Sequence, residues 1–215
     1  MDTGSRYVEH RHEISEPVVA LTFDDGPSEW TDPIVEHLRR HGATATFFVI
    51  GSAIDKSGGE TLRNAAAAGC EIANHTYSHR LLPSLAEDEI RDELVRTSAR
   101  IEEVATRPPS LWRAPHFRSD ERIRALAAGL GLLEVRCSVF TGDYAWPALK
   151  TAAWVLHHLR PGAIVDLHDG RPQTDTVDDA APTREATVEA VGRILGEMET
   201  RGYRSVTVSE LLAIP

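Results

Sequence analysis

The sequence predicts an α/β fold in which helices cover a sheet of parallel strands. Short β-branched and apolar runs alternate with amphipathic helical segments about seven times along the chain. No change of composition interrupts this alternation, so one domain is expected. Polar clusters also follow the predicted strands, as expected where the carboxyl ends of parallel strands meet at one face.

The elements follow from local signals. The apolar run PVVALTF predicts a strand at 17–23 that ends at the turn residues DDGP, and a helix at 31–42 begins with Thr31 as candidate N-cap and ends at Gly42. The next helix is expected at 61–69, and a long amphipathic helix at 85–105. The other predicted strands are 43–51, 70–74, 110–114, 132–140, 163–170 with its loop, and 203–208. The other predicted helices are 119–131, capped by Ser119, 148–162 and 183–202.

Domain organisation is expected to be simple. Residues 1–16 form a polar N-terminal extension, and residues 17–215 form a single domain. The longest loop-like stretch, 169–182, is acidic and flanked by proline. Such a loop either borders a binding cleft or is mobile, and the sequence leaves both open.

Composition and charge exclude several classes of protein. The chain has 41% hydrophobic and 26% charged residues, with no run long enough to span a bilayer. Its net charge of -10 and scattered arginines disfavour nucleic acid as a partner. Cys70 and Cys137 have no paired spacing, so neither a disulfide framework nor a zinc ribbon is indicated. No apolar signal segment is visible, so a cytoplasmic protein is expected, without membrane attachment or an obligate protein partner.

Residues that could bind a metal ion or take part in catalysis follow the predicted strands. Two histidines four residues apart, His75 and His79, follow the third strand in NHTYSHR. Such a pair alone is a weak indication of a metal site. TFDDGP at 22–27, RAP at 113–115, GDY at 142–144 and LHD at 167–169 follow other strands, so their polar groups are expected to converge with the pair.

Taken in order, TFDDGP, HTYSH, RAP and LHD resemble the motifs of the polysaccharide deacetylases of the NodB-homology type, carbohydrate esterase family four. The resemblance runs from about Val18 to the final helix, and TFDDGP is its most specific part. It implies an irregular (β/α)7 barrel of the NodB-homology type. It also implies one divalent metal ion held by Asp25, His75 and His79.

The chemistry of these ligands agrees with that expectation. One carboxylate and two imidazoles with open positions for water suit zinc or another first-row divalent ion. Zinc is expected, with cobalt, nickel or manganese as alternatives that the sequence does not separate. The ion polarises an acyl carbonyl and lowers the pKa of water.

The resemblance also implies the catalytic roles. Asp24 is the general base, Arg113 pairs with Asp24, and His168 is the general acid that protonates the leaving group. The backbone N–H of His116 contributes to the oxyanion hole. Pro115, whose ring fixes its backbone φ angle, holds this part of the backbone rigidly in position.

The chain departs from the family pattern in two motifs. Against Asp-x-x-Asp-Trp, one register makes Asp143 the second Asp, Tyr144 the Trp and Phe140 the missing first Asp, so that Asp143 orients His168. A second register uses Ala145 and Trp146 and leaves His168 without that partner. We prefer the first register because it keeps the carboxylate.

In the motif after Arg113, the family has Tyr and Gly where this chain has His116 and Phe117, which alters the substrate groove. Asp166 places a carboxylate in a predicted buried strand, and its role is open. The expected contacts to substrate and oxyanion are His116, Pro115, Phe117, Tyr144, Trp146 and Leu167.

The function that this resemblance implies is metal-dependent removal of an N-linked acetyl group from an amino sugar or related carbohydrate. Without the resemblance, the residues support only metal-assisted hydrolysis of an amide or ester. Two alternatives stay open: a deacetylase or amidase acting on a small biosynthetic molecule, and a catalytically silent glycan-binding protein.

Overall fold

The computed structural model describes residues 7–11, 13–172 and 183–215. In this part of the chain, parallel strands form an eight-stranded sheet in the order β1-β6-β5-β4-β3-β2-β7, with β8 paired to β2. The expected loop at 169–182 falls mostly outside the described residues. The strands are β1 (Tyr7–Val8), β2 (Val18–Asp24), β3 (Thr46–Val49), β4 (Glu71–Asn74), β5 (Leu111–Trp112), β6 (Leu133–Val135), β7 (Ile164–His168) and β8 (Arg204–Ser205).

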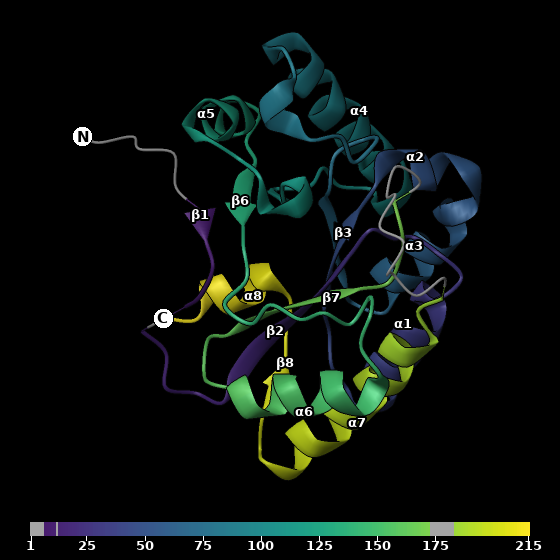
Figure 1. Ribbon diagram of the computed structural model, residues 1–215, viewed down its shortest axis with the longest axis vertical. Helices are drawn as coiled ribbons and strands as arrows, with labels where there is room; N and C mark the ends of the chain where they lie inside the picture. Colours follow the sequence, from purple (N-terminus) through teal and green to yellow (C-terminus); the bar gives the residue numbers. More distant parts are fainter. Residues whose placement is uncertain (1–6, 12, 173–182) are drawn as a thin grey trace.

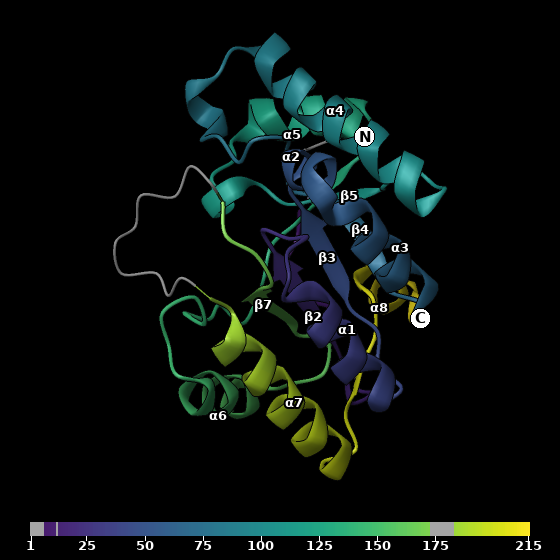
Figure 2. The same ribbon diagram turned by 90° about the vertical axis from the view of Figure 1, so that its right-hand side faces the viewer.

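Most of the helices cover this sheet on its outer side. Figures 1 and 2 show α4 and α5 at one end of the longest axis and α6 and α7 at the other, with the strands between them. Among the described residues, no helix is both long and apolar enough to cross a bilayer. The α-helices are α1 (Thr31–Arg40), α2 (Gly51–Ala53), α3 (Gly59–Ala67), α4 (Glu87–Ala105), α5 (Glu121–Gly129), α6 (Ala148–His158), α7 (Glu185–Thr200) and α8 (Val208–Ala213). A π-helix, η1 (Ile54–Gly58), and two 3₁₀ turns, η2 (Leu82–Ser84) and η3 (Pro115–Phe117), complete the helical elements.

The segment between β6 and α6 draws the two edges of the sheet together. The predicted strand at 132–140 is wrong in one respect, because β6 ends at Val135 and pairs with β5 only as far as Glu134. Further along, Val139 makes a parallel bridge to Val165 of β7, and the amide of Asp166 donates to the Val139 carbonyl at 2.9 Å. One predicted strand is therefore divided between two neighbours, and the curled parallel sheet confirms the irregular (β/α)7 barrel.

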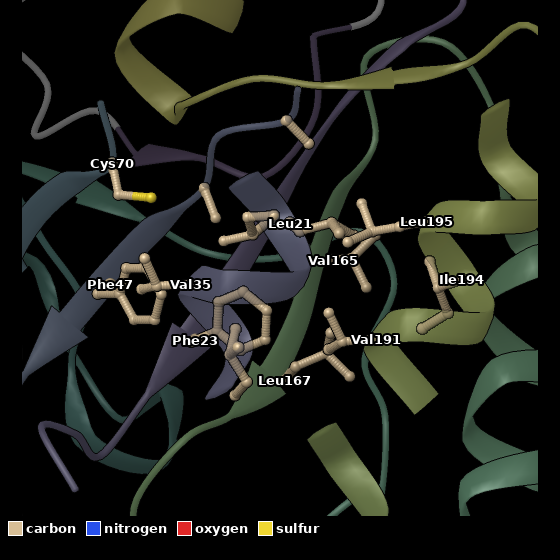
Figure 3. Packing of buried hydrophobic residues seen from close by; sticks show 14 of the residues in the cluster. Leu21, Phe23, Val35, Phe47, Cys70, Val165, Leu167, Val191, Ile194 and Leu195 are labelled. Atoms are coloured by element: carbon tan, nitrogen blue, oxygen red, sulfur yellow. The ribbon is translucent and has the colours of Figure 1, made fainter. Parts of the chain in front are cut away.

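Alternation along β2 separates the core from the site. Leu21 and Phe23 belong to the cluster that packs under α7, where Figure 3 shows them near Val191. Ala20 faces the other cluster, inside the curled sheet. Because successive side chains of a strand point to opposite faces, Asp24 also points inward, at the carboxyl end of the strand.

The two predicted helix N-caps, Thr31 and Ser119, also need correction. Trp30 is the N-cap of α1, while the Thr31 hydroxyl accepts from the Ser28 amide at 2.9 Å. Asp120 caps α5 by accepting from the Ile123 amide at 2.9 Å, whereas Ser119 donates to Glu134.

The chain ends also differ from the predicted elements. The predicted strand at 203–208 shortens to β8 and continues into α8, whose Val208 and Leu211 pack on the inner cluster. Within the predicted extension, Tyr7 pairs with Glu134 of β6.

Candidate active site

The polar clusters predicted at the strand ends converge on one pocket. Its volume is about 250 Å³. Asp24 ends β2, His75 follows β4 and His168 ends β7, so parallel strands deliver all three side chains to the same edge. The residues that line the pocket are Asp24, Asp25, His75, His79, His116, Phe117, Phe140, Tyr144, His168 and Arg184.

Asp25, His75 and His79 form a compact buried group. One ligand atom from each residue lies within 4.8 Å of the others. Asp25 Oδ1 lies 3.4 Å from His75 Nε2 and 3.2 Å from His79 Nε2. Asp25 and His79 adopt positive φ angles of 74° and 56°, a conformation that costs about 1–2 kcal/mol for an L-residue. Strain of this kind concentrates at functional sites.

The geometry of this group fits a divalent cation. His75 Nδ1 lies 2.9 Å from the Arg113 carbonyl, which can only accept, so Nδ1 carries the proton. In the neutral ring, Nε2 then turns its lone pair toward Asp25 Oδ1, a buried oxygen without a hydrogen bond among the described residues. A cation between these atoms would satisfy both.

The protonation states of Asp25 and His79 also suit metal binding. Burial lowers the pKa of His75, but the charge of Asp24 and the contact with Asp25 outweigh it and raise this pKa, so a bound metal ion would have to replace the proton on Nε2. Burial raises the pKa of Asp25, but the adjacent imidazoles, His75 first, lower it to about 2. Burial, and then the positive charge of a protonated His75, lowers the pKa of His79 to about 3. An ionised carboxylate and a neutral imidazole are the forms in which these side chains bind metal.

A backbone constraint explains the glycine of TFDDGP. A side chain at Gly26 would overlap the carboxylate of Asp169, which is fully buried beside it. The Thr31 hydroxyl donates to that carboxylate, so Asp169 joins the end of β7 to the start of α1. Glycine is needed here because the chain passes close to a buried side chain, immediately after Asp25.

Arg113 holds Asp24 from within the curled sheet. Its guanidinium is fully buried, and Nη1 donates to Asp24 Oδ1 at 2.7 Å, to Thr22 Oγ1 at 2.8 Å and to Asp166 Oδ1 at 3.1 Å. Although Asp24, Asp166 and His168 also cluster within 4.8 Å, the guanidinium already supplies a cation to both carboxylates.

The structure also places Asp166, whose role the sequence leaves open. Burial, and then the charge of Asp24, raises the pKa of Asp166 to about 8. The carboxyl group is therefore mostly protonated at neutral pH, and the charge of Arg113 acts mainly on Asp24.

His168 meets Asp143 at the opposite wall. His168 Nδ1 lies 2.8 Å from Asp143 Oδ1, and the second carboxylate oxygen accepts from the His168 amide at 2.8 Å and from Thr187 Oγ1 at 2.7 Å. This contact is the one expected from the first of the two motif registers, in which Asp143 is the second Asp and orients His168. Burial lowers the pKa of His168, but the charge of Asp143 outweighs it and raises the pKa well above its usual value.

Replacing Asp143 by asparagine is expected to move the alkaline limb of kcat/KM to lower pH. His168 can donate a proton only below its pKa, and Asp143→Asn removes the charge that raises this pKa. The measurement is the pH profile of kcat/KM. Thr187→Val, which removes only a hydrogen bond to Asp143, is the matched control and should move the limb less. An unchanged limb in Asp143→Asn would argue against this coupling.

The expected substrate contacts divide into two groups. His116, Phe117 and Tyr144 line the pocket, with the His116 ring 4.8 Å from that of His79 and the Tyr144 ring 5.4 Å from that of His168. Pro115, Trp146 and Leu167 do not line it. Pro115 begins the turn η3, and the Trp146 ring packs edge-to-face with Trp154 at 5.7 Å. Leu167 is fully buried in the core beside Phe23, as Figure 3 shows, so a side-chain contact to substrate is wrong for this residue.

The backbone of η3 explains one departure from the family pattern. His116 and Phe117 have positive φ angles of 54° and 55°. Glycine adopts this conformation without steric cost, so the glycine of the family pattern is the residue that the backbone favours at Phe117. In this chain the phenyl ring of Phe117 lines the pocket, where glycine would have only a hydrogen atom.

Sequence reasoning missed three residues of this region. The Glu93 carboxylate accepts from the amides of Tyr77 and Ser78, both at 2.8 Å, and so fixes the loop between the two histidines. Its signal was a charged residue on the apolar face of a predicted amphipathic helix, beside Ile90, Leu94 and Thr97. Phe140 lines the pocket, and Arg184 lines it while donating to the Gly170 carbonyl at 2.9 Å. Arg184 had no local signal, whereas Phe140 was noted only as the residue that replaces the first Asp of the family pattern.

The fold and the site together are those of a hydrolase. The strand ends of an α/β barrel carry an Asp/His group of the metal-binding kind. Beside this group lie Asp24, paired with Arg113, and His168, paired with Asp143. The chain belongs to the polysaccharide deacetylase family, whose model matches residues 11–135. It is therefore a deacetylase, a hydrolase that acts on amide bonds.

Individual relatives agree with this assignment. A chitooligosaccharide deacetylase from Bradyrhizobium sp. (strain ANU 289) is 36% identical over 190 residues, which cover 86% of each chain. A solved peptidoglycan N-acetylglucosamine deacetylase, in complex with a naphthyl-substituted N-hydroxybenzamide, is 30% identical with a TM-score of 0.82, over 94% of this chain and 90% of that chain. A Bacillus anthracis pseudoenzyme of carbohydrate esterase family four is 24% identical with a TM-score of 0.85, over 98% of this chain and 70% of that chain, which shows the fold alone.

Proposed function

We propose that this protein removes the acetyl group from N-acetylated amino sugars of a chitin-like or peptidoglycan-like carbohydrate. One observation carries the proposal: a single pocket joins the Asp25, His75 and His79 group to a paired base candidate, Asp24, and a paired acid candidate, His168. The similarity to chitooligosaccharide and peptidoglycan N-acetylglucosamine deacetylases supports this substrate class.

Asp25, His75 and His79 would hold one divalent ion, which we propose to be zinc, with cobalt, nickel or manganese as alternatives. When bound, the ion supplies Lewis acidity to the acyl carbonyl and lowers the pKa of water.

The protein's own groups move the protons. Asp24, held by Arg113 at 2.7 Å, takes a proton from the attacking water. The backbone N–H of His116 donates to the oxyanion that forms at the acyl carbon. His168, held by Asp143 at 2.8 Å, gives a proton to the amide nitrogen as the C–N bond breaks, releasing acetate and the amine.

The test is acetate release by the zinc-loaded protein from a panel of chitin oligomers, N-acetylglucosamine and acetylated xylan. Asp24→Asn is the blank, because it keeps the shape of the side chain but removes the base. We expect release from the chitin oligomers, at least about 100-fold above the blank. Release only from a small amide would instead support the small-molecule alternative. No acetate release from any substrate of the panel, with one ion bound per chain, would support the alternative of a glycan-binding protein without catalytic activity.

A further inference from the structure

The pocket is small for the substrate class proposed above. Its volume of about 250 Å³ lies below the roughly 300–1,000 Å³ that is typical of sites for drug-sized ligands. One sugar unit with its acetyl group is therefore the most that fits against Asp24 and Asp25. The other units of an oligosaccharide must lie on the surface that continues from the pocket mouth.

Two phenylalanines form that surface, here called the aromatic rim. Phe117 and Phe140 both line the pocket, and their rings meet edge-to-face with centroids 6.1 Å apart and an interplanar angle of 72°. Phe140 is also 52% exposed, so it belongs to the pocket and to the open surface at once. An exposed phenyl ring at the mouth of a polar site has no evident role in the core.

The rim is held in place before any ligand arrives. The Phe117 amide donates to the Ala114 carbonyl at 2.9 Å, and the Arg113 guanidinium lies 5.4 Å from the Phe117 ring centroid. On the other side, the indole N–H of Trp154 in α6 donates to the Phe140 carbonyl at 3.0 Å. A surface fixed in this way loses little conformational entropy on binding.

Both rim residues are departures from the family pattern. Phe117 stands where the pattern has glycine, and in the register that pairs Asp143 with His168, Phe140 stands where it has aspartate. The two positions belong to different motifs and to different loops, yet the structure brings their rings into contact. The exchange of a hydrogen and a carboxylate for two phenyl rings makes this edge of the pocket apolar.

We propose that the aromatic rim binds the sugar unit adjacent to the one that loses its acetyl group, so that the preferred substrates are oligosaccharides rather than free amino sugars. This inference rests on the proposed function. The apolar C–H face of a sugar ring complements a phenyl ring, whose face carries partial negative charge. An acyl chain is the poorer occupant, because the acyl carbon must reach the pocket floor at Asp24 and Asp25, whereas Phe140 lies at the exposed mouth.

The test compares Phe140→Ala with wild type on N-acetylglucosamine and on chitotriose. We expect wild type to prefer chitotriose, and Phe140→Ala to raise KM for chitotriose by roughly 2- to 10-fold more than it raises KM for the monosaccharide. Leu149→Ala is the matched control, since Leu149 is an exposed apolar residue of α6 that does not line the pocket. Phe117→Gly, which also relieves the positive φ angle, should repeat the effect of Phe140→Ala.

A binding measurement separates this inference from the proposed function. Calorimetry with chitotriose compares Asp24→Asn with Asp24→Asn/Phe140→Ala, so that binding is read without turnover. Weaker chitotriose binding by the double variant would support sugar binding at the aromatic rim, even if wild type released no acetate. Absence of acetate release would then contradict the proposed function but not the role of the rim. An equal loss of kcat/KM on both sugars, or unchanged chitotriose binding, would overturn the rim. N-butyrylglucosamine completes the set, because a loss confined to this longer acyl group would assign the rim to the acyl chain instead.

Discussion

Replacing His79 by alanine is expected to abolish stoichiometric binding of a divalent ion and, with it, acetate release. His79 Nε2 lies 3.2 Å from Asp25 Oδ1, so the ring forms one side of the compact ligand group. Removal of a group that only supports a metal ligand costs about 10- to 100-fold in metal affinity, and removal of a ligand should exceed this. The measurement is metal content per chain after dialysis against zinc, with acetate release from chitin oligomers as second readout.

The chain supplies a close control for this experiment. His116 is an exposed histidine whose ring lies 4.8 Å from that of His79, but it is not part of the ligand group. His116→Ala should keep one ion per chain. Full metal content in His79→Ala, or an equal loss in His116→Ala, would refute the assignment of the ligands.

Replacing His168 by alanine is expected to keep the metal and to lower kcat for N-acetylated sugars by roughly 10²- to 10⁴-fold. An amine leaves an amide only when its nitrogen is protonated, and His168 is the proposed donor. An aryl acetate such as 4-nitrophenyl acetate has a leaving group that needs no proton. His168→Ala should therefore reduce aryl acetate hydrolysis by less than about 10-fold.

Comparison with Asp24→Asn distinguishes the acid from the base. Asp24 acts on the attacking water, so its loss should slow the amide and the aryl ester alike. Undiminished turnover of the N-acetylated sugar by His168→Ala would remove His168 from the mechanism. An equal loss on both substrates would make it a second base or a structural group.

Much of the site was predictable because parallel strands deliver their carboxyl ends to one edge. Asp24, His75, Arg113 and His168 were expected to converge from the order of the motifs, and their side chains do meet. The choice between two registers for Asp143 is also resolved in space by the 2.8 Å contact with His168.

The errors have physical causes of different kinds. Leu167 was expected at the substrate, but a strand alternates its faces, so the neighbour of an inward His168 must point to the core. The strand expected at 132–140 leaves β5 and joins β7, because closing a curled sheet requires a partner at its other edge. The β-propensity of the individual residues does not indicate such a change of partner strand. The helix α8 was missed for a similar reason, since it is stabilised by packing on the inner cluster.

The sequence by itself determined which chemical groups reach the site, because turn residues end each strand and the polar residue at that end is read directly from the chain. The motifs implied that Arg113 pairs with Asp24 and Asp143 with His168, and the tertiary structure brings these groups together across 89 and 25 positions of the chain. The contact of Phe117 with Phe140, from two different loops, was decided by the tertiary structure alone. Periodicity and turn chemistry are local, whereas these contacts depend on how the sheet curls and on positive φ angles that the whole fold imposes.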